Sequence, residues 1–346
     1  MSERQRARRA EQLLALDTKA VPKGASETVR GPRGEDPGSR LKRWKLIVLA
    51  VVAAAAVAGT GYLGIRAKSE AHTLITNPIE TRHLPGRTPE DYSVPFENVG
   101  VITADGLSLV GWYVPSRNGA AVIAQHGYKA DRGEMLNEAA MLHQHGFGVL
   151  LSTIRAHDLS EGHLITFGRD EVKDLAAWWR FLRSRPDVQP DRIGFLGNSF
   201  GGTLGIQFAA GEPGVAAVVT NSAFSSLEDT IDTSVRFFTG LPPFPFASLI
   251  RYFAEREAGF SASEVDAKRW IARLSPRPVL LMQGGADVVI SKSSGDRLFE
   301  AARDPKELWF EPEVGHSGFD EAFPEEYEKR VVAFFRKYLL RPTHGA

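Results

Sequence analysis

The fold of this chain is decided by one short stretch, GFLGNSFGG at residues 194–202, which joins two predicted elements through a Gly-x-Ser-x-Gly turn. The residues before the turn, 192–196, form a short apolar run typical of a buried strand. After the turn, Leu204 and Phe208 stand four residues apart, so they share one face of a predicted helix over residues 203–210. A lone Gly-x-Ser-x-Gly is weak evidence in a chain with 33 glycines. Ser199 is therefore a candidate nucleophile whose partners must be found elsewhere in the chain.

Predicted strands and helices alternate from His83 to about Leu340. The first two strands, 96–103 and 107–114, are joined through Asp105-Gly106, a hairpin signal. Further strands are predicted at 120–125, 147–153, 192–196, 215–220, 278–283 and 307–310, and helices at 134–144, 170–184, 203–210, 292–302 and 325–339. Runs such as 121–124 and 279–282 are apolar throughout, as strands buried on both faces require. The pattern predicts an α/β fold over residues 83–346, with a mostly parallel twisted sheet covered by helices on both faces.

The alternation is interrupted over residues 223–274, where the sequence is helix-like and holds no clear strand. We expect a helical cap inserted over the carboxyl edge of the sheet. The segment is rich in large apolar residues: Phe237, Phe238, Leu241, Pro242, Pro243, Phe244, Phe246, Tyr252 and Phe253. Most of them are expected to pack the cap onto the sheet, with the alternative that some line an apolar substrate pocket or face a bilayer.

A membrane helix is predicted at residues 46–65, which hold no charged residue and approach the roughly 20 positions that a bilayer core requires. Trp44 and Tyr62 stand where interfacial aromatic residues belong. Basic residues crowd the N-terminal flank (Arg40, Lys42, Arg43, Lys45), against Arg66 and Lys68 after the span. The positive-inside rule then predicts residues 1–45 as a flexible, basic cytoplasmic tail, 66–82 as a linker, and the catalytic domain as extracytoplasmic.

Two alternatives compete with a retained membrane span. The run Ala56-Val57-Ala58 has the pattern of a signal-peptide cleavage site, but the preceding region is far longer than that of a signal peptide. A buried core helix is also apolar all round, but it would not follow a basic tail rich in proline and glycine.

Composition excludes several classes of function. The chain of 346 residues balances 42 Lys and Arg against 42 Asp and Glu, which gives no overall electrostatic argument for a nucleic-acid partner. It has no cysteine, so disulfides, cysteine-bound metals and thiol nucleophiles are excluded. No pattern in the sequence decides the oligomeric state.

Two later strands deliver the partners that a serine nucleophile needs. A serine hydroxyl requires a base to take its proton, and that base requires a carboxylate to hold its tautomer. Asp287 follows the strand at 278–283, and His316 follows the strand at 307–310. Because ligands of open α/β sheets bind at the carboxyl ends of the strands, these residues are expected to meet Ser199 there. Asp229, which follows the strand at 215–220, is the rival acid.

A second group of polar residues, His157, Asp158 and His163, lies in one loop. These residues lack the helical spacing of four positions that a histidine pair needs to bind a metal from one face. A structural or solvated role is favoured, and no metal or other cofactor is expected.

Residues 95–340 resemble the α/β-hydrolase superfamily, in which serine, acid and histidine follow one another in this order. The run Gln125-His126-Gly127-Tyr128 looks like the oxyanion loop of that family. Residues 160–174 resemble the segment that, in the family, leads into the helix before the Gly-x-Ser-x-Gly turn, the nucleophile elbow. Within the superfamily, the chain is most similar to the membrane-anchored bud-emergence-type and prolyl-oligopeptidase-like groups. One departure is that Arg155-Ala156-His157-Asp158 replaces the Arg-Gly-x-Gly turn common in the family.

The resemblance implies a role for each site residue. Ser199 would attack a carbonyl, His316 would move the proton, and Asp287 would orient the imidazole. The backbone N–H groups of Phe200 and Tyr128 would receive the oxyanion. We therefore expect a membrane-anchored serine hydrolase that cleaves an ester, thioester or amide of a small acyl substrate through an acyl-enzyme. A short-peptide serine peptidase and a non-catalytic binding protein of the same fold are the alternatives.

Overall fold

The computed structural model describes residues 37–340, and these divide into two compact units, one ending at Gly59 and the other beginning at Thr60. Helix α2 (Pro37–Ile75) runs from the first unit into the second. Its apolar side chains in the first unit, such as Leu46 and Val57, are exposed. By length and composition α2 is able to cross a membrane. The tail expected at residues 1–45 lies largely outside the described residues.

Residues 66–82, expected as a linker, are helical as far as Ile75. Ala67, Ala71 and Ile75 are all buried in the main hydrophobic core. Their spacing of four residues places them in one stripe along the helix, which packs against the second unit. The first part of the expected linker therefore packs against the second unit, because its apolar residues recur with the helical period.

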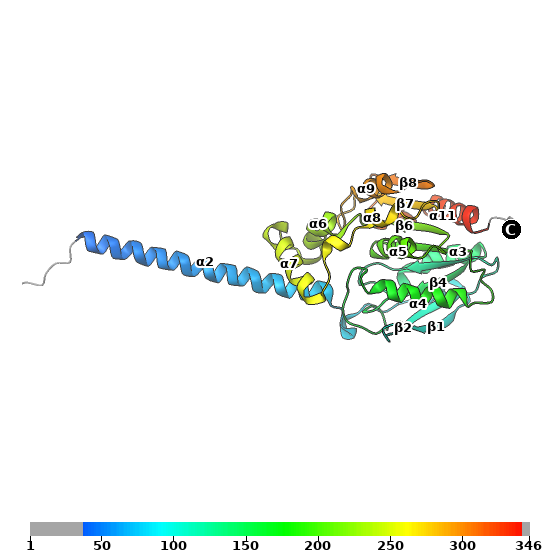
Figure 1. Ribbon diagram of the computed structural model, residues 1–346, viewed down its shortest axis with the longest axis horizontal. Coiled ribbons are helices and arrows are strands. Elements are labelled where there is room, and N and C mark those ends of the chain that lie inside the picture. Colours follow the sequence, from blue (N-terminus) through cyan, green and yellow to red (C-terminus); the bar gives the residue numbers. More distant parts are fainter. Residues whose placement is uncertain (1–36, 341–346) are drawn as a thin grey trace, which may run out of the picture. The chain divides into compact units, whose positions relative to one another are not determined.

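The second unit is built on an eight-stranded sheet with the order β1-β2-β4-β3-β5-β6-β7-β8 (Figure 1). The strands are β1 (Glu97–Ile102), β2 (Ser108–Val114), β3 (Ala121–Gln125), β4 (Gly148–Ser152), β5 (Ile193–Asn198), β6 (Ala217–Asn221), β7 (Val279–Gly284) and β8 (Lys306–Glu311). β2 is antiparallel to β1 and to β4, and the pairs from β4 to β8 are parallel. The predicted mostly parallel sheet and its N-terminal hairpin are confirmed.

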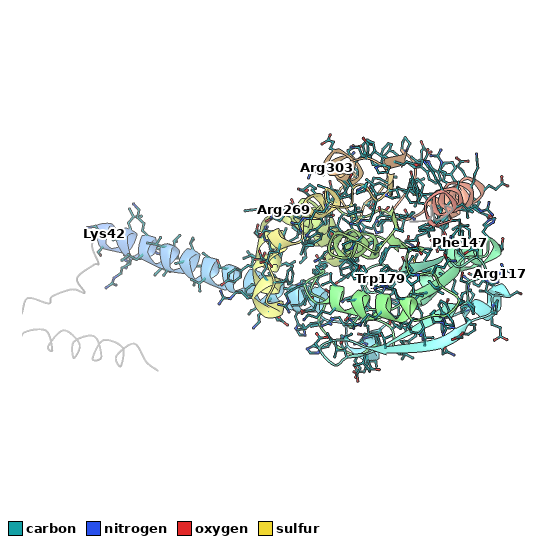
Figure 2. All side chains as sticks on the ribbon, turned by 45° about the vertical axis from the view of Figure 1, so that its right-hand side comes forward. Lys42, Arg117, Phe147, Trp179, Arg269 and Arg303 are labelled. Carbon is teal, nitrogen blue, oxygen red and sulfur yellow. The ribbon has the colours of Figure 1, made fainter. Side chains whose placement is uncertain are left out.

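Helices cover both faces of the sheet, because the side chains of each buried strand alternate between the faces. Ile123 and Phe195 face the core under α4 and α5, whereas Val122 and Leu196 face the core under α3 and α11. Figure 1 shows α4 and α5 lying across the strands on the near side. The covering helices are α3 (Leu136–Gln144), α4 (Glu171–Arg183), α5 (Phe200–Gly211), α8 (Ala267–Ile271), α9 (Ser294–Ala301), the short α10 (Phe319–Ala322) and α11 (Pro324–Leu339). Trp179 and Phe147, labelled in Figure 2, belong to the two different cores.

The segment between β6 and β7 forms the helical cap. It contains α6 (Leu227–Thr239), α7 (Pro243–Ala258) and α8, and the described residues 223–274 include no strand. Its aromatic residues divide among three environments. Phe246 is buried in the core, Phe238 lines a pocket, and Phe244 is exposed. The cap therefore uses its apolar residues both to pack and to shape a cavity.

A buried ion pair ties the turn after β4 to helix α4. The Arg155 guanidinium lies 2.7 Å from Asp174 and 2.9 Å from Asp105, and its side chain is 8% exposed. The Asp174 side chain has no exposed surface and also accepts a hydrogen bond from the Arg155 N–H at 2.8 Å. A carboxylate so enclosed depends on its partner, because an unpaired buried charge is costly.

We expect Arg155→Met to lower the free energy of unfolding by about 3–5 kcal/mol, since it leaves Asp174 buried without its cation. Urea unfolding of the detergent-solubilised full chain measures the change. Arg303→Met is the matched control, because Arg303 lies on the surface (Figure 2) and should shift stability by no more than about 0.5 kcal/mol. Equal effects of the two substitutions would contradict a structural role for the buried pair.

Candidate active site

Ser199 occupies a sharp turn between the end of β5 and the start of α5. Its backbone has φ 50° and ψ −116°, a conformation that side-chain-bearing residues rarely adopt. Such strain costs about 1–3 kcal/mol and persists only where the surroundings impose it. Here the Ser199 N–H donates to the Asn221 carbonyl at 2.7 Å, so the neighbouring strand β6 helps to hold the turn.

Two glycines flank the turn because neither position has room for a side chain. A Cβ at Gly197 would lie 2.4 Å from the carbonyl carbon of Gly201. A Cβ at Gly201 would lie 2.4 Å from the Gln125 oxygen and 2.5 Å from the His126 oxygen. The first turn of α5 therefore packs directly on the backbone of the β3 loop, and only glycine permits this approach.

His316 and Asp287 are brought to Ser199 from the ends of two later strands. The Ser199 Oγ lies 2.8 Å from His316 Nε2, and His316 Nδ1 lies 2.7 Å from Asp287 Oδ2. The other carboxylate oxygen of Asp287 accepts hydrogen bonds from the Val289 and Ile290 N–H groups at 2.8 and 3.0 Å. The Asp287 side chain is fully buried, whereas that of His316 is 21% exposed. This chain of hydrogen bonds gives the serine a proton acceptor and gives that acceptor a fixed carboxylate.

The loop that carries His316 is held by strand β6, which sequence reasoning did not assign to the site. Asn221 Nδ2 donates to the Ser317 carbonyl at 3.1 Å, and the Ser317 N–H donates to Ser222 Oγ at 3.0 Å. Asn221 ends strand β6 at the carboxyl edge of the sheet and Ser222 follows it, and that position was the available signal.

The loop after β3, which carries Tyr128, passes beside Ser199. Gly127 lies against Ser199, since a Cβ at Gly127 would be 3.4 Å from the Ser199 Cβ. The adjacent amides have acceptors: Gly127 donates to Glu134 and Lys129 to His157, both at 3.0 Å. Between them, the Tyr128 N–H has no acceptor within residues 37–340.

Phe200 is the first residue of helix α5, so its N–H is one of the N-terminal amides that have no hydrogen-bond partner within the helix. Together with the Tyr128 N–H, it gives two backbone donors on the loops that flank Ser199.

Glu134 is an exposed residue whose carboxylate reaches the back of this loop, and sequence reasoning did not identify it. Its Oε2 accepts the Gly127 N–H, and desolvation of the carboxylate raises its pKa. Because Gly127 touches both Glu134 and Ser199, Glu134 supports the backbone next to Ser199.

The departure at residues 155–158 has a structural explanation. Ala156 and Asp158, which stand at the glycine positions of the family turn, have φ of 60° and 51°. The turn thus keeps its left-handed backbone without glycine. His157 Nδ1 donates to the Arg155 carbonyl at 2.8 Å, and its Nε2 accepts from the Lys129 N–H. Burial holds the pKa of His157 well below its usual range, so the ring is neutral and supports the Tyr128 loop.

The remaining candidate residues lie in other surroundings. Asp229 is 2.6 Å from both Lys268 and Arg297. Burial alone would raise the pKa of Asp229, but the hydrogen bonds from Lys268 and Arg297 outweigh it and lower the pKa. His163 is exposed, and Asp158 pairs with Arg132 at 3.1 Å. Within residues 37–340, no three His, Cys, Asp or Glu side chains gather as metal ligands would.

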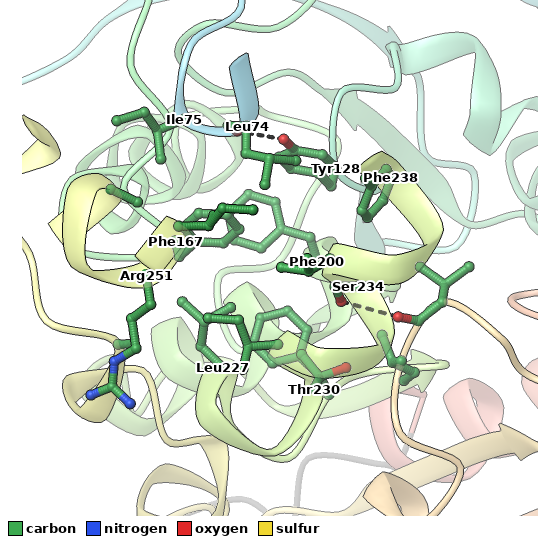
Figure 3. A pocket seen from close by; sticks show the side chains of 18 of the residues that line it. Leu74, Ile75, Tyr128, Phe167, Phe200, Leu227, Thr230, Ser234, Phe238 and Arg251 are labelled. Atoms are coloured by element: carbon green, nitrogen blue, oxygen red, sulfur yellow. Dashed lines mark hydrogen bonds between the residues drawn. The ribbon is translucent and has the colours of Figure 1, made fainter. Parts of the chain in front are cut away.

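An apolar pocket opens beside Ser199 (Figure 3). The cap contributes Leu227 and Phe238, and the sheet side contributes Phe167 and Phe200. Leu74, near the end of helix α2, lines it as well. Pockets of this kind bind small molecules, with the polar groups of the site fixing orientation.

The packing of α5 yields a matched pair of glycine substitutions. Gly201→Ala is expected to destabilise the protein by about 1–3 kcal/mol and to displace the Tyr128 loop, because its Cβ meets backbone atoms. Gly211→Ala, at the other end of α5, meets no atom within 4 Å and should be neutral or mildly stabilising. Thermal unfolding of both variants measures the difference, and similar midpoints would show that the close approach is not required.

Three comparisons relate the chain to known proteins. A model of the X-Pro dipeptidyl-peptidase (S15) family matches residues 102–240, which is less than half of the chain. The uncharacterized protein Rv2307c of Mycobacterium tuberculosis (strain H37Rv) is 30% identical over 238 residues, which cover 68% of this chain and 75% of that protein. The uncharacterized protein YfhR of Escherichia coli (strain K12) is 26% identical over 255 residues, or 71% of this chain and 82% of that protein.

Among solved structures, the esterase Pf2001 of Pyrococcus furiosus matches with a TM-score of 0.66 and 26% identity. The match covers 77% of this chain and 98% of the esterase. Together with the fold, these matches support a serine hydrolase in general terms. The chain belongs to the α/β-hydrolase superfamily, in the same family as Rv2307c.

Proposed function

We propose that this protein is a serine hydrolase that cleaves an ester, thioester or amide through an acyl-enzyme, with Ser199, His316 and Asp287 as its triad. The observation that carries the proposal is the continuous hydrogen-bonded chain from the Ser199 hydroxyl through His316 to the buried Asp287. The strained backbone of Ser199 adds to it, since such strain is concentrated at functional sites.

In the first half of the reaction, Ser199 Oγ attacks the carbonyl carbon while His316 Nε2 takes its proton. Asp287 accepts the Nδ1–H of the imidazole and stabilises the imidazolium that forms. His316 then gives the proton to the leaving alcohol, thiol or amine, and the acyl group remains on Ser199. In the second half, water attacks the acyl-enzyme, His316 takes a water proton, and Ser199 leaves with that proton restored.

The N–H groups of Phe200 and Tyr128 are the proposed oxyanion donors. Negative charge develops on the substrate oxygen in both halves of the reaction, and each such donor contributes about 2.7–4 kcal/mol to stabilising it. Neither donor needs a particular side chain, because both are backbone groups. Glu134 and His157 are then positioning residues that hold the amides on either side of the Tyr128 N–H.

Esters and thioesters are the preferred substrates, with short peptides as a second candidate. The likeness to the Pyrococcus furiosus esterase and the apolar pocket beside Ser199 favour an acyl ester. The match of residues 102–240 to the S15 family favours a peptidase. Chromogenic X-Pro dipeptide amides and nitrophenyl esters, offered side by side, discriminate between the two.

Labelling with a fluorophosphonate probe tests the triad. Wild type should be labelled and Ser199→Ala should not, and Asp287→Asn should lower kcat by about 10⁴-fold because the imidazole loses its correct tautomer. Asp229→Asn is the comparison, since Asp229 is the other acid considered for the triad. Equal labelling of wild type and Ser199→Ala would refute the nucleophile, and loss of activity in Asp229→Asn alone would refute the acid.

We further propose that α2 anchors the protein in a membrane with the N-terminus in the cytoplasm, like the membrane-anchored bud-emergence-type hydrolases. The basic residues before Leu46 support this orientation. A protease added outside intact cells is then expected to digest the catalytic domain and to spare a tag placed at the N-terminus. Digestion of the catalytic domain only after the membrane is opened would reverse the orientation.

A further inference from the structure

The pocket beside Ser199 has one wall that comes from outside the sheet and the cap. Leu74 and Ile75, in the last turn of helix α2, line it opposite the cap residue Leu227 (Figure 3). The candidate membrane span and the cavity next to the nucleophile therefore share one continuous helix.

This last turn of α2 is fixed to the catalytic domain by backbone bonds as well as by packing. The Ile165 N–H donates to the Ile75 carbonyl at 2.8 Å, and Thr76 forms an antiparallel bridge with Leu164. Asn77 follows, and its side chain donates to the Ala156 carbonyl at 2.7 Å. The wall is thus built into the domain, so its side chains keep a defined position in the pocket.

The end of α2 also holds the loop that carries a proposed oxyanion donor. The Tyr128 hydroxyl donates to the Leu74 carbonyl, and Lys129 Nζ donates to the Thr73 carbonyl at 2.6 Å. The last carbonyls of a helix lack internal partners and carry partial negative charge, so they attract these donors. Tyr128 in turn lines the pocket, which links the helix end, the loop and the cavity.

The polar side chains of the pocket are already bonded within the protein. Ser234 donates to the Val289 carbonyl at 3.0 Å (Figure 3), and Thr230 accepts from the Ser291 N–H at 3.1 Å. Arg251 is paired with Glu228 at 2.7 Å and with Glu255 at 2.9 Å. What the pocket presents to a ligand is consequently apolar surface, and binding there is driven by burial of apolar area.

We propose that the pocket is an acyl-chain site, in which Leu74 and Ile75 of the anchor helix contact an unbranched apolar chain of the substrate whose carbonyl lies at Ser199. This assignment rests on the proposed hydrolase function. The anchor then has two roles, since its N-terminal part is the candidate membrane span and its last turn selects the substrate. The site prefers long chains over short ones, because each methylene group buried there raises kcat/KM by a factor of up to about four.

A series of nitrophenyl esters from acetate to octanoate tests the site on the full chain in detergent. Wild type should show a ratio of kcat/KM for octanoate over acetate of at least about 10. Leu74→Trp places a large side chain in the pocket and should lower that ratio at least about tenfold. Leu227→Trp blocks the opposite wall and should do the same, which keeps the test valid if one variant fails to fold.

Ile79→Trp is the control, because Ile79 is exposed, lies five residues beyond Leu74 and does not line the pocket. It should leave the ratio unchanged. Fluorophosphonate labelling of each variant reports separately that the serine is intact. If wild type is labelled at Ser199 but shows no preference for long chains, or if neither tryptophan variant changes the ratio, the acyl-chain site is wrong and the hydrolase function stands. If labelling does not depend on Ser199, the function itself fails, and the site with it.

Phospholipid vesicles and soluble octanoate esters offer the same apolar chain from two sources. Fatty acid released from phosphatidylglycerol vesicles, and lost in Leu74→Trp, would assign a membrane lipid as the source. Hydrolysis confined to soluble esters would assign a soluble one.

Discussion

The close approach of helix α5 to the loops of β3 and β5 is the constraint on which this structure depends. Gly201 lies so near the Gln125 and His126 carbonyls that a single methyl group would overlap them. Ser199 stands at the same turn, two residues before Gly201, on a strained backbone. The Phe200 amide at the start of α5 and the Tyr128 amide in the loop after β3 lie on the two segments that meet at this contact. The close packing at Gly201 therefore lies next to both Ser199 and the loop that carries a proposed oxyanion donor.

Around that contact the site is assembled from loops at the carboxyl ends of several strands. β7 leads to Asp287 and β8 to His316, while Asn221 at the end of β6 and Ser222 just after it hold the histidine loop. Behind the β3 loop, Glu134 and the neutral His157 bind neighbouring amides. The groups that face the substrate are therefore few, and most of the polar residues nearby serve to hold backbone in place.

The end of helix α2 extends this arrangement beyond the hydrolase fold. Its terminal carbonyls bind Tyr128 and Lys129, and its last side chains enter the pocket. A helix that ended in a flexible linker would carry the domain without influencing it. Because Ala67, Ala71 and Ile75 are buried in the core, the C-terminal part of this helix is packed into the domain that holds the cavity.

The sequence by itself determined the α/β class, the strand order along the chain, the elbow and the order of Ser199, Asp287 and His316. These follow from local signals: apolar runs, helical spacing and short motifs next to strand ends. Tertiary structure alone decided that residues 66–75 belong to the domain, that Glu134 and Asn221 support the site, and that Leu74 lines the pocket. Those roles depend on contacts between residues far apart in the chain, such as Tyr128 with Leu74 and Asn221 with Ser317. No local pattern records such contacts, because they exist only once the sheet has brought its strand ends together.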